Sequence, residues 1–183
     1  MSDLQHMRTE RLRLDIPTID DLPELSAIYA DPRTWAHAPD DVQSTDATLV
    51  MLAGWLDGWE SDGLGPWIVR SLDDDAVLGN AGCWLRPGGW WNLGYGVAPD
   101  IRREGVATEA ARPALTAAAE VAPDSPVIAF LLEHNVASKR VAENLGMTLQ
   151  YRGPDEGHPD PAAIRLVYAD RKLTPEQLSA RLG

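Results

Sequence analysis

The sequence contains only one cysteine, Cys83, among its 183 residues. A single cysteine cannot form an internal disulfide or build a cysteine-rich metal site, and it is usually a small apolar core residue. The four histidines have no spacing that suggests a metal site. The sequence therefore predicts neither a disulfide scaffold nor a metal centre.

Long hydrophobic runs are also missing. The longest apolar stretches, such as Val127–Leu132, are far shorter than the roughly 20 residues of a membrane-spanning helix. The first residues, MSDLQHMRTERLRL, contain no apolar signal segment. We therefore expect a soluble, cytoplasmic protein with no membrane partner.

Positive charge is scarce, because 16 Lys and Arg residues face 28 Asp and Glu residues and give a net charge of −12. Sequence-independent binding to nucleic acid needs a surplus of positive charge. A nucleic-acid partner is therefore disfavoured, and any anion must be held by a few local residues.

The residues that are present suffice for a buried core, since 44% are hydrophobic and 24% are charged. Repeats and low-complexity tracts are absent, and the turn-rich segments are short. We expect one domain over residues 1–183, with residues 170–183 as a C-terminal tail.

Hydrophobic periodicity predicts an α+β fold, a mixed sheet with helices on its faces. The expected strands are residues 11–14, 67–70, 77–86, 90–98, 127–132, 147–152 and 164–169. The expected helices are residues 22–30, a segment starting at 44, an alanine-rich segment after Pro99, residues 135–146 and residues 174–182. Thr18 or Asp20 is expected to cap the first helix, and Pro113 is expected to bend the alanine-rich one near Glu109.

The strand over residues 90–98 has one face of large apolar side chains, and its other face carries Asn92, Gly94 and Gly96. The first face is expected to pack and the second to stay open. Two glycines on one face of a strand indicate either close approach of a ligand or another backbone, or a bulge or bend. The pattern leaves both alternatives open.

The spacing Arg102-x-x-Gly105-x-Ala107 follows this strand at the start of the alanine-rich helix. The N–H groups of a first helical turn have no partner within the helix, and small residues leave room for a phosphate to bind them. Arg102 and Arg103 add positive charge beside them. The pattern is degenerate, so a solvated arginine pair before an ordinary helix remains the alternative.

Several segments together resemble the GNAT acyltransferases, in the branch of the ribosomal-protein N-terminal acetyltransferases. They are TERLRL, DPRTW, LGNAG, NLGYGVAP, RREGVATEA and NVASKRVAENLGM, in this order along nearly the whole chain. The resemblance implies a single GNAT domain, with a mixed, mostly antiparallel sheet, splayed central strands and helices on both faces. It also implies acetyl-CoA as co-substrate.

By the same resemblance, the pyrophosphate of acetyl-CoA binds the start of the alanine-rich helix. The pantetheine arm lies along Val97, in the gap between that strand and Val127–Leu132. The cofactor-binding residues implied in this way are Val97, Arg102, Arg103, Gly105, Val106, Ala107, Thr108, Asn135 and Ser138.

The implied reaction is direct attack of a neutral amine on the thioester. A strand N–H near Val97 would stabilise the oxyanion, and the Ser138 hydroxyl would assist the departing thiolate. Ser138 alternatively belongs to the N-terminal cap region of its helix. Ala142 stands where many relatives carry a tyrosine acid.

In relatives, the position of Asn92 often carries a carboxylate that acts as a base. The amide of Asn92 cannot act as a base. It could instead orient a water or the amine, or simply meet solvent. A weak base favours an α-amine, with a pKa of about 7.8, over a lysine amine at about 10.4.

The resemblance also implies an acceptor cleft between the first two helices and loop 153–162. Asp40, Asp41, Asp155, Glu156 and Asp160 could attract a cationic amine there, although such acids are usually solvated. His37 and His158 are possible bases near the cleft, although loop histidines are usually exposed, and His134 is expected to be structural. A non-catalytic acyl-CoA-binding regulatory module is the alternative function, which Asn92 and Ala142 favour.

Overall fold

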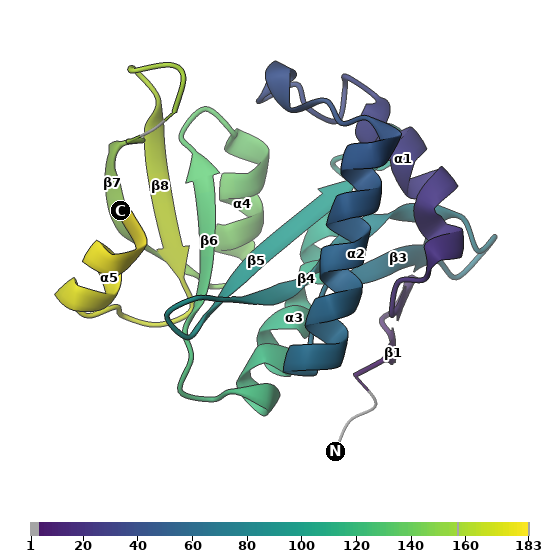
Figure 1. The fold of residues 1–183 in the computed structure, drawn as a ribbon, viewed down its shortest axis with the longest axis horizontal. Helices are drawn as coiled ribbons and strands as arrows, with labels where there is room; N and C mark the ends of the chain where they lie inside the picture. The colour runs from purple at the N-terminus through teal and green to yellow at the C-terminus, as the bar shows by residue number, and fades with distance from the viewer. Residues whose placement is uncertain (1–3, 157, 183) are drawn as a thin grey trace.

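One eight-stranded sheet, in the order β1-β2-β3-β4-β5-β6-β8-β7, runs through the molecule in a computed structural model that describes residues 4–156 and 158–182 (Figure 1). All neighbouring strands are antiparallel except β5 and β6, which are parallel. The strands are β1 His6–Arg8, β2 Leu12–Asp15, β3 Trp67–Ser71, β4 Val77–Arg86, β5 Trp90–Val97, β6 Val127–Leu132, β7 Thr148–Pro154 and β8 Ile164–Ala169. The predicted strands are confirmed to within two residues at each end, and only the short β1 was not expected.

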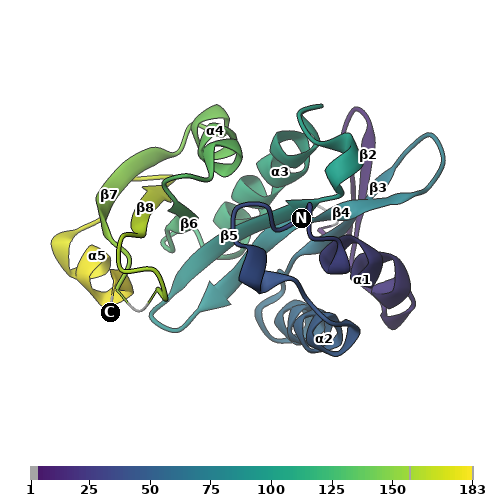
Figure 2. The ribbon, with the colours of Figure 1, turned by 90° about the horizontal axis from the view of Figure 1, so that it is seen from above.

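Helices cover both faces of the sheet, so the predicted α+β class is confirmed (Figure 2). They are α1 Leu22–Ala30, α2 Thr45–Asp62, α3 Val106–Val121, α4 Val136–Asn144 and α5 Pro175–Leu182, with 3₁₀ turns η1 Ile19–Asp21, η2 Pro39–Asp41 and η3 Pro99–Ile101. Helices α3 and α4 lie on one face, and α1, α2 and α5 lie on the other (Figures 1 and 2). No helix in the described part of the chain is long and apolar enough to cross a membrane.

The cap of α1 differs from the prediction, because the η1 turn precedes the helix. Asp21 is the N-cap residue of α1 and makes no side-chain cap bond. Thr18 caps η1 instead, and its backbone N–H donates to the Asp21 carboxylate at 2.7 Å. The sequence pattern therefore assigned Thr18, which caps the η1 turn, to helix α1.

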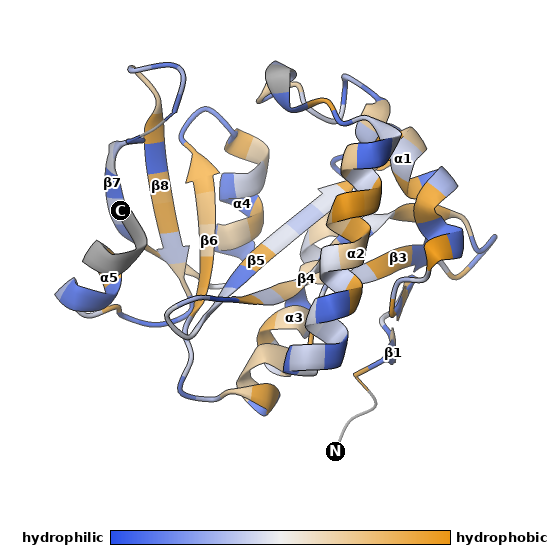
Figure 3. Ribbon diagram, viewed as in Figure 1, coloured by the Kyte–Doolittle hydropathy of each residue, from blue (hydrophilic) through white to orange (hydrophobic). Residues whose placement is uncertain are grey.

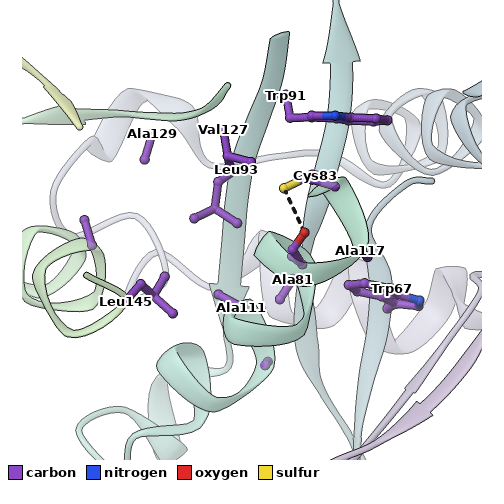
Figure 4. Packing of buried hydrophobic residues seen from close by; sticks show 14 of the residues in the cluster. Trp67, Ala81, Cys83, Trp91, Leu93, Ala111, Ala117, Val127, Ala129 and Leu145 are labelled. Atoms are coloured by element: carbon purple, nitrogen blue, oxygen red, sulfur yellow. Dashed lines mark hydrogen bonds between the residues drawn. The ribbon is translucent and has the colours of Figure 1, made fainter. Parts of the chain in front are cut away.

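The main core lies between the sheet and the alanine-rich face of α3. Ala110, Ala114 and Ala118 are fully buried, so small side chains let α3 lie close on the sheet as predicted. The buried Cys83 thiol donates to the Ala114 carbonyl at 3.8 Å (Figure 4), and burial raises the pKa of this thiol. Helix α3 continues through Pro113, and the bend near Glu109 stays a prediction.

The prediction of an open face on β5 is wrong. A Cβ atom at Gly94 would lie 2.6 Å from the ring of Trp84, which comes from β4. A Cβ atom at Gly96 would lie 3.0 Å from the hydroxyl of Tyr29, which in turn donates to Asn80 Oδ1 at 2.6 Å. The two glycines therefore make room for side chains of neighbouring elements, and the unbroken β4–β5 register excludes a bulge there. Each glycine also lines one of the two cavities described below, so the ligand alternative stays open.

Strands β5 and β6 separate after a short parallel pairing (Figure 1). Their register contains only Trp91 opposite Val127 and Asn92 opposite Ile128. Beyond this point β6, which is hydrophobic along its whole length (Figure 3), pairs with β8, while β5 stays with β4 up to Val97. The splayed central strands are thus confirmed, and the gap opens towards their C-terminal ends.

Candidate active site

A cavity of about 540 Å³ lies where β5 ends and α3 and α4 begin. Every residue predicted to bind the cofactor lines this cavity: Val97, Arg102, Arg103, Gly105, Val106, Ala107, Thr108, Asn135 and Ser138. The fold thus brings together residues from three separate segments of the sequence. The cavity is the candidate cofactor site.

The first turn of α3 presents uncapped backbone amides to the cavity. Gly105 is the N-cap residue with φ +84°, a conformation that costs glycine little, and no side chain caps the helix. The N–H groups of Val106, Ala107 and Thr108 precede the first intrahelical donor, Glu109, whose N–H bonds the Gly105 carbonyl. These amides are free to bind an anion.

The one acidic side chain in this turn points away from the cavity. The Glu109 carboxylate accepts hydrogen bonds from Thr9 Oγ1 at 2.5 Å and from Arg11 Nε at 2.8 Å. Burial alone would raise the pKa of Glu109, but these bonds outweigh it, so the pKa is lowered and the carboxylate stays charged. Its charge is therefore compensated by Arg11 rather than directed at the anion site.

Arg102 has a structural contact that the sequence did not indicate. Its guanidinium donates to the backbone carbonyls of Arg33 and Thr34, each at 2.6 Å. These bonds hold loop 31–44 against the cavity wall. Arg102 therefore lines the cavity with two of its nitrogens already bound to the protein.

Sequence reasoning missed Arg140, an exposed residue of α4 that also lines the cavity. Arg103 and Arg140 form no ion pair with any residue that the structure describes. Helical spacing could have identified Arg140 from the sequence. Arg140 shares one face of α4 with Ala137, Val141 and Asn144, and all four residues line the cavity.

A second cavity, of about 230 Å³, lies in the gap between β5 and β6. Its walls include Leu93 and Gly94 of β5 and Phe130 of β6, with Asp41 from the loop between α1 and α2. The two cavities share His37, Tyr95, Asn135 and Ser138. These four residues form the junction between the cavities, and we use this name for them below.

Two hydrogen bonds involve junction residues, one within the start of α4 and one between β5 and α4. Asn135 caps α4, because its side-chain oxygen accepts from the Ser138 N–H at 3.1 Å. The Tyr95 hydroxyl donates to the Ser138 carbonyl at 3.0 Å, and burial raises the pKa of Tyr95 to about 12, so this donor stays protonated. The Ser138 hydroxyl itself has no hydrogen-bond partner among the residues described in the structure.

The end of β5 also directs two backbone N–H groups into the gap. The Trp91 N–H donates to Pro126 on the β6 side, and the Ala98 N–H donates to Leu78 on the β4 side. Successive N–H groups of a strand alternate in direction, so those of Tyr95 and Val97 point to the β6 side. Since pairing with β6 ends at Asn92, these two amides face the gap.

His37 is a half-buried residue whose backbone is held firmly at the junction. The His37 carbonyl accepts from His134 Nε2 at 2.7 Å, a contact that fits the structural role expected for His134. The His37 ring stacks on Trp35 with the centroids 6.2 Å apart. Burial lowers the pKa of His37, and the nearby charges of Arg102 and His134 lower it further, whereas Asp41 raises it. Its ring nitrogens have no hydrogen-bond partner among the side chains and backbone groups that the structure describes.

Comparison with known proteins decides the family. The sequence model of the acetyltransferase (GNAT) domain matches residues 11–148, which is more than half of the chain. The chain belongs to the GNAT acetyltransferase family. No curated protein sequence matches this GNAT chain significantly.

Solved structures of GNAT proteins share its fold. An acetyltransferase from Agrobacterium tumefaciens is 25% identical, with a TM-score of 0.75 over 94% of this chain and 97% of that one. RimL, a ribosomal L7/L12 α-N-protein acetyltransferase in complex with coenzyme A, is 15% identical, with a TM-score of 0.75 over 90% and 96%. MccE, a microcin C7 self-immunity acetyltransferase in complex with acetyl-CoA and AMP, is 11% identical, with a TM-score of 0.73 over 88% and 93%.

Two residues singled out in the sequence do not reach the junction of this GNAT protein. Asn92 lines neither cavity, because it lies at the closed end of the gap, opposite Ile128. His158 also lies outside both cavities, and its Nδ1 accepts from the Asp160 N–H at 3.0 Å.

The acidic residues expected around the acceptor cleft are also separated. Asp41 lines the second cavity, whereas the Asp155 carboxylate forms an ion pair with Arg165 and lines neither cavity. The side chain of Asp40 lies outside the described residues. Ala142, which stands at the position where many relatives carry a tyrosine acid, is fully buried in the core.

Proposed function

We propose that this GNAT protein transfers the acetyl group of acetyl-CoA directly to a primary amine, namely the α-amine of a protein N-terminus or of a small molecule. The observation that carries the proposal is the junction, where the cavity at the start of α3 meets the cavity in the β5–β6 gap. A donor and an acceptor that enter from the two cavities meet there.

The residues of the larger cavity fit coenzyme A. The uncapped amides of Val106, Ala107 and Thr108 are suited to the pyrophosphate, and Arg103 and Arg140 supply positive charge beside them. Val97 would contact the pantetheine arm where it enters the gap. Acetyl-CoA supplies an acyl group that is already activated as a thioester.

The chain itself supplies hydrogen-bond donors on both sides of the reacting carbon. The Val97 N–H would bind the carbonyl oxygen as negative charge develops on it. The Ser138 hydroxyl would donate to the sulfur as the C–S bond breaks. A thiol has a pKa of about 8.5, so this hydrogen bond is sufficient assistance for its departure as a thiolate.

The choice of an α-amine follows from the acid–base groups in the gap. Asn92 cannot act as a base, and the Asp41 carboxylate lines the gap but is not one of the four junction residues. His37 is a junction residue, but its lowered pKa makes it a weak base. At pH 7 roughly a tenth of an α-amine is neutral, whereas a lysine amine costs about 3.5 kcal/mol more to deprotonate. The acceptor with the lower pKa is therefore favoured.

Acetylation of matched peptides tests this proposal. One peptide has a free α-amine and no lysine, and the other has a blocked N-terminus and one lysine. We expect free CoA and acetylated product, identified by mass spectrometry, to form faster with the first peptide at equal concentration. Faster acetylation of lysine would contradict the α-amine assignment.

The same assay separates an enzyme from a non-catalytic acyl-CoA-binding module. Such a module would be stabilised against heat by acetyl-CoA but would release no CoA with any amine. The free Ser138 hydroxyl and the second cavity beside it support turnover.

A further inference from the structure

We propose that His37 accepts the proton that the acceptor amine loses when it is acetylated. The inference rests on the proposed function, and it chooses between the two histidines, His37 and His158, that the sequence offered as possible bases. It starts from the position of His37, which borders both cavities. Among the described side chains of the junction, only His37 and Tyr95 titrate, and Tyr95 stays protonated.

Hydrogen bonds hold the backbone of His37 and of the loop that precedes it. His134 donates to its carbonyl from the loop before α4, and Arg102 holds the preceding loop residues Arg33 and Thr34. The imidazole stacks on Trp35, whose Nε1 donates to the Tyr29 carbonyl at 2.7 Å. A residue merely exposed in a loop would not have these supports.

The imidazole is in the form that a base requires. Burial is the main cause that lowers the pKa of His37, the positive charge of Arg102 and the neighbouring His134 lower it further, and the negative charge of Asp41 opposes them. The pKa of His37 is lowered, so the ring is neutral at pH 7 and one nitrogen carries a free lone pair.

The proton balance is complete with these groups. The amine nitrogen bonds to the acetyl carbon, the C–S bond breaks, and the electron pair leaves with the sulfur as a thiolate. The nitrogen loses one proton, which passes to His37. The imidazolium then returns that proton to solvent or to the thiolate before the next turnover.

His37→Gln tests the assignment, with His158→Gln as the matched control outside both cavities. We expect His37→Gln to lower kcat by about 10²-fold or more, with the affinity for coenzyme A within about threefold of wild type. In the wild type, kcat at saturating acceptor should fall as the pH drops through a pKa below the ordinary histidine value of 6.5. The variant should lose this dependence, and His158→Gln should keep it.

Chemical rescue provides a second readout. Added imidazole should restore part of the activity of His37→Ala and leave His158→Ala unchanged. An active wild type together with an unchanged kcat and pH dependence in His37→Gln would overturn this inference alone. A wild type that acetylates no amine would overturn the proposed function, and this inference with it.

Discussion

Ser138 has a structural role in the fold and a proposed role in the chemistry. Its N–H donates to the Asn135 cap and its carbonyl accepts from Tyr95, so its backbone ties the start of α4 to β5. Its hydroxyl takes no part in either bond and lies at the junction of the two cavities. The sequence left the cap and the catalytic role as alternatives, and the structure allows both.

Ser138→Ala separates the two roles, because alanine keeps the backbone groups and removes only the hydroxyl. We expect kcat to fall about 10- to 100-fold, the effect of losing a hydrogen bond of 1.5–3 kcal/mol to a charged group. Melting temperature and affinity for coenzyme A should stay near the wild-type values.

Ser125→Ala, in the loop after α3 and outside both cavities, is the control for this substitution. Unchanged turnover in Ser138→Ala would limit Ser138 to the cap.

All residues that the sequence predicted to bind the cofactor line the larger cavity, and what the sequence missed has physical causes. Gly105 and Ala107 were found because a helix N-terminus is a local feature. Gly94 was misread because Trp84 fills the space above it from another strand. Arg102 was assigned to a phosphate alone, since its contacts to loop 31–44 depend on a distant segment.

Helix α3 is the element that carries the anion site, and Glu109 joins its first turn to the residues before β2. The carboxylate accepts from Thr9 Oγ1 and from the backbone and side chain of Arg11. These contacts connect residues about 100 positions apart in the sequence. They fix the turn that presents the free amides.

Glu109→Gln should lower the free energy of unfolding by about 1–3 kcal/mol at pH 7. The pKa of Glu109 is lowered in the folded protein, so its contribution is present above the unfolded value of 4.5 and is lost as the pH falls through the folded pKa. Urea unfolding of variant and wild type should therefore differ at pH 7 and converge in acid.

Glu60→Gln, an exposed change on α2, should alter the free energy of unfolding little at any pH. A difference between Glu109→Gln and wild type that persisted at low pH would contradict the ionic origin of the effect.

Most elements were predictable because periodicity is local, as Val127–Leu132 and residues 164–169 show. The η turns were missed, and with them the true cap of α1. The length of the β5–β6 pairing could not be derived from the residues of either strand. It depends on the pairing of β5 with β4 and of β6 with β8, which are contacts with other parts of the chain. For the same reason Asn92 was expected at the site but lies at the closed end of the gap.

At the scale of the whole molecule, the charge distribution restricts where an anion can bind. The chain has a net charge of −12, yet Arg102, Arg103 and Arg140 all line the cavity at the start of α3. Loop 31–44, the end of β5 and the starts of α3 and α4 enclose it together. The proposed diphosphate site therefore gathers positive charge locally in a protein whose net charge is strongly negative.

Calorimetric titration with coenzyme A, comparing Ala107→Glu with Ala119→Glu, tests this claim most directly. Both variants add one negative charge to α3, and a glutamate in the first turn favours the helix, so Ala107→Glu should fold. We predict binding of one coenzyme A per chain to the wild type and to Ala119→Glu, and at least about 100-fold weaker binding to Ala107→Glu. Equal affinity in all three proteins, or no heat of binding to the wild type, would contradict the account.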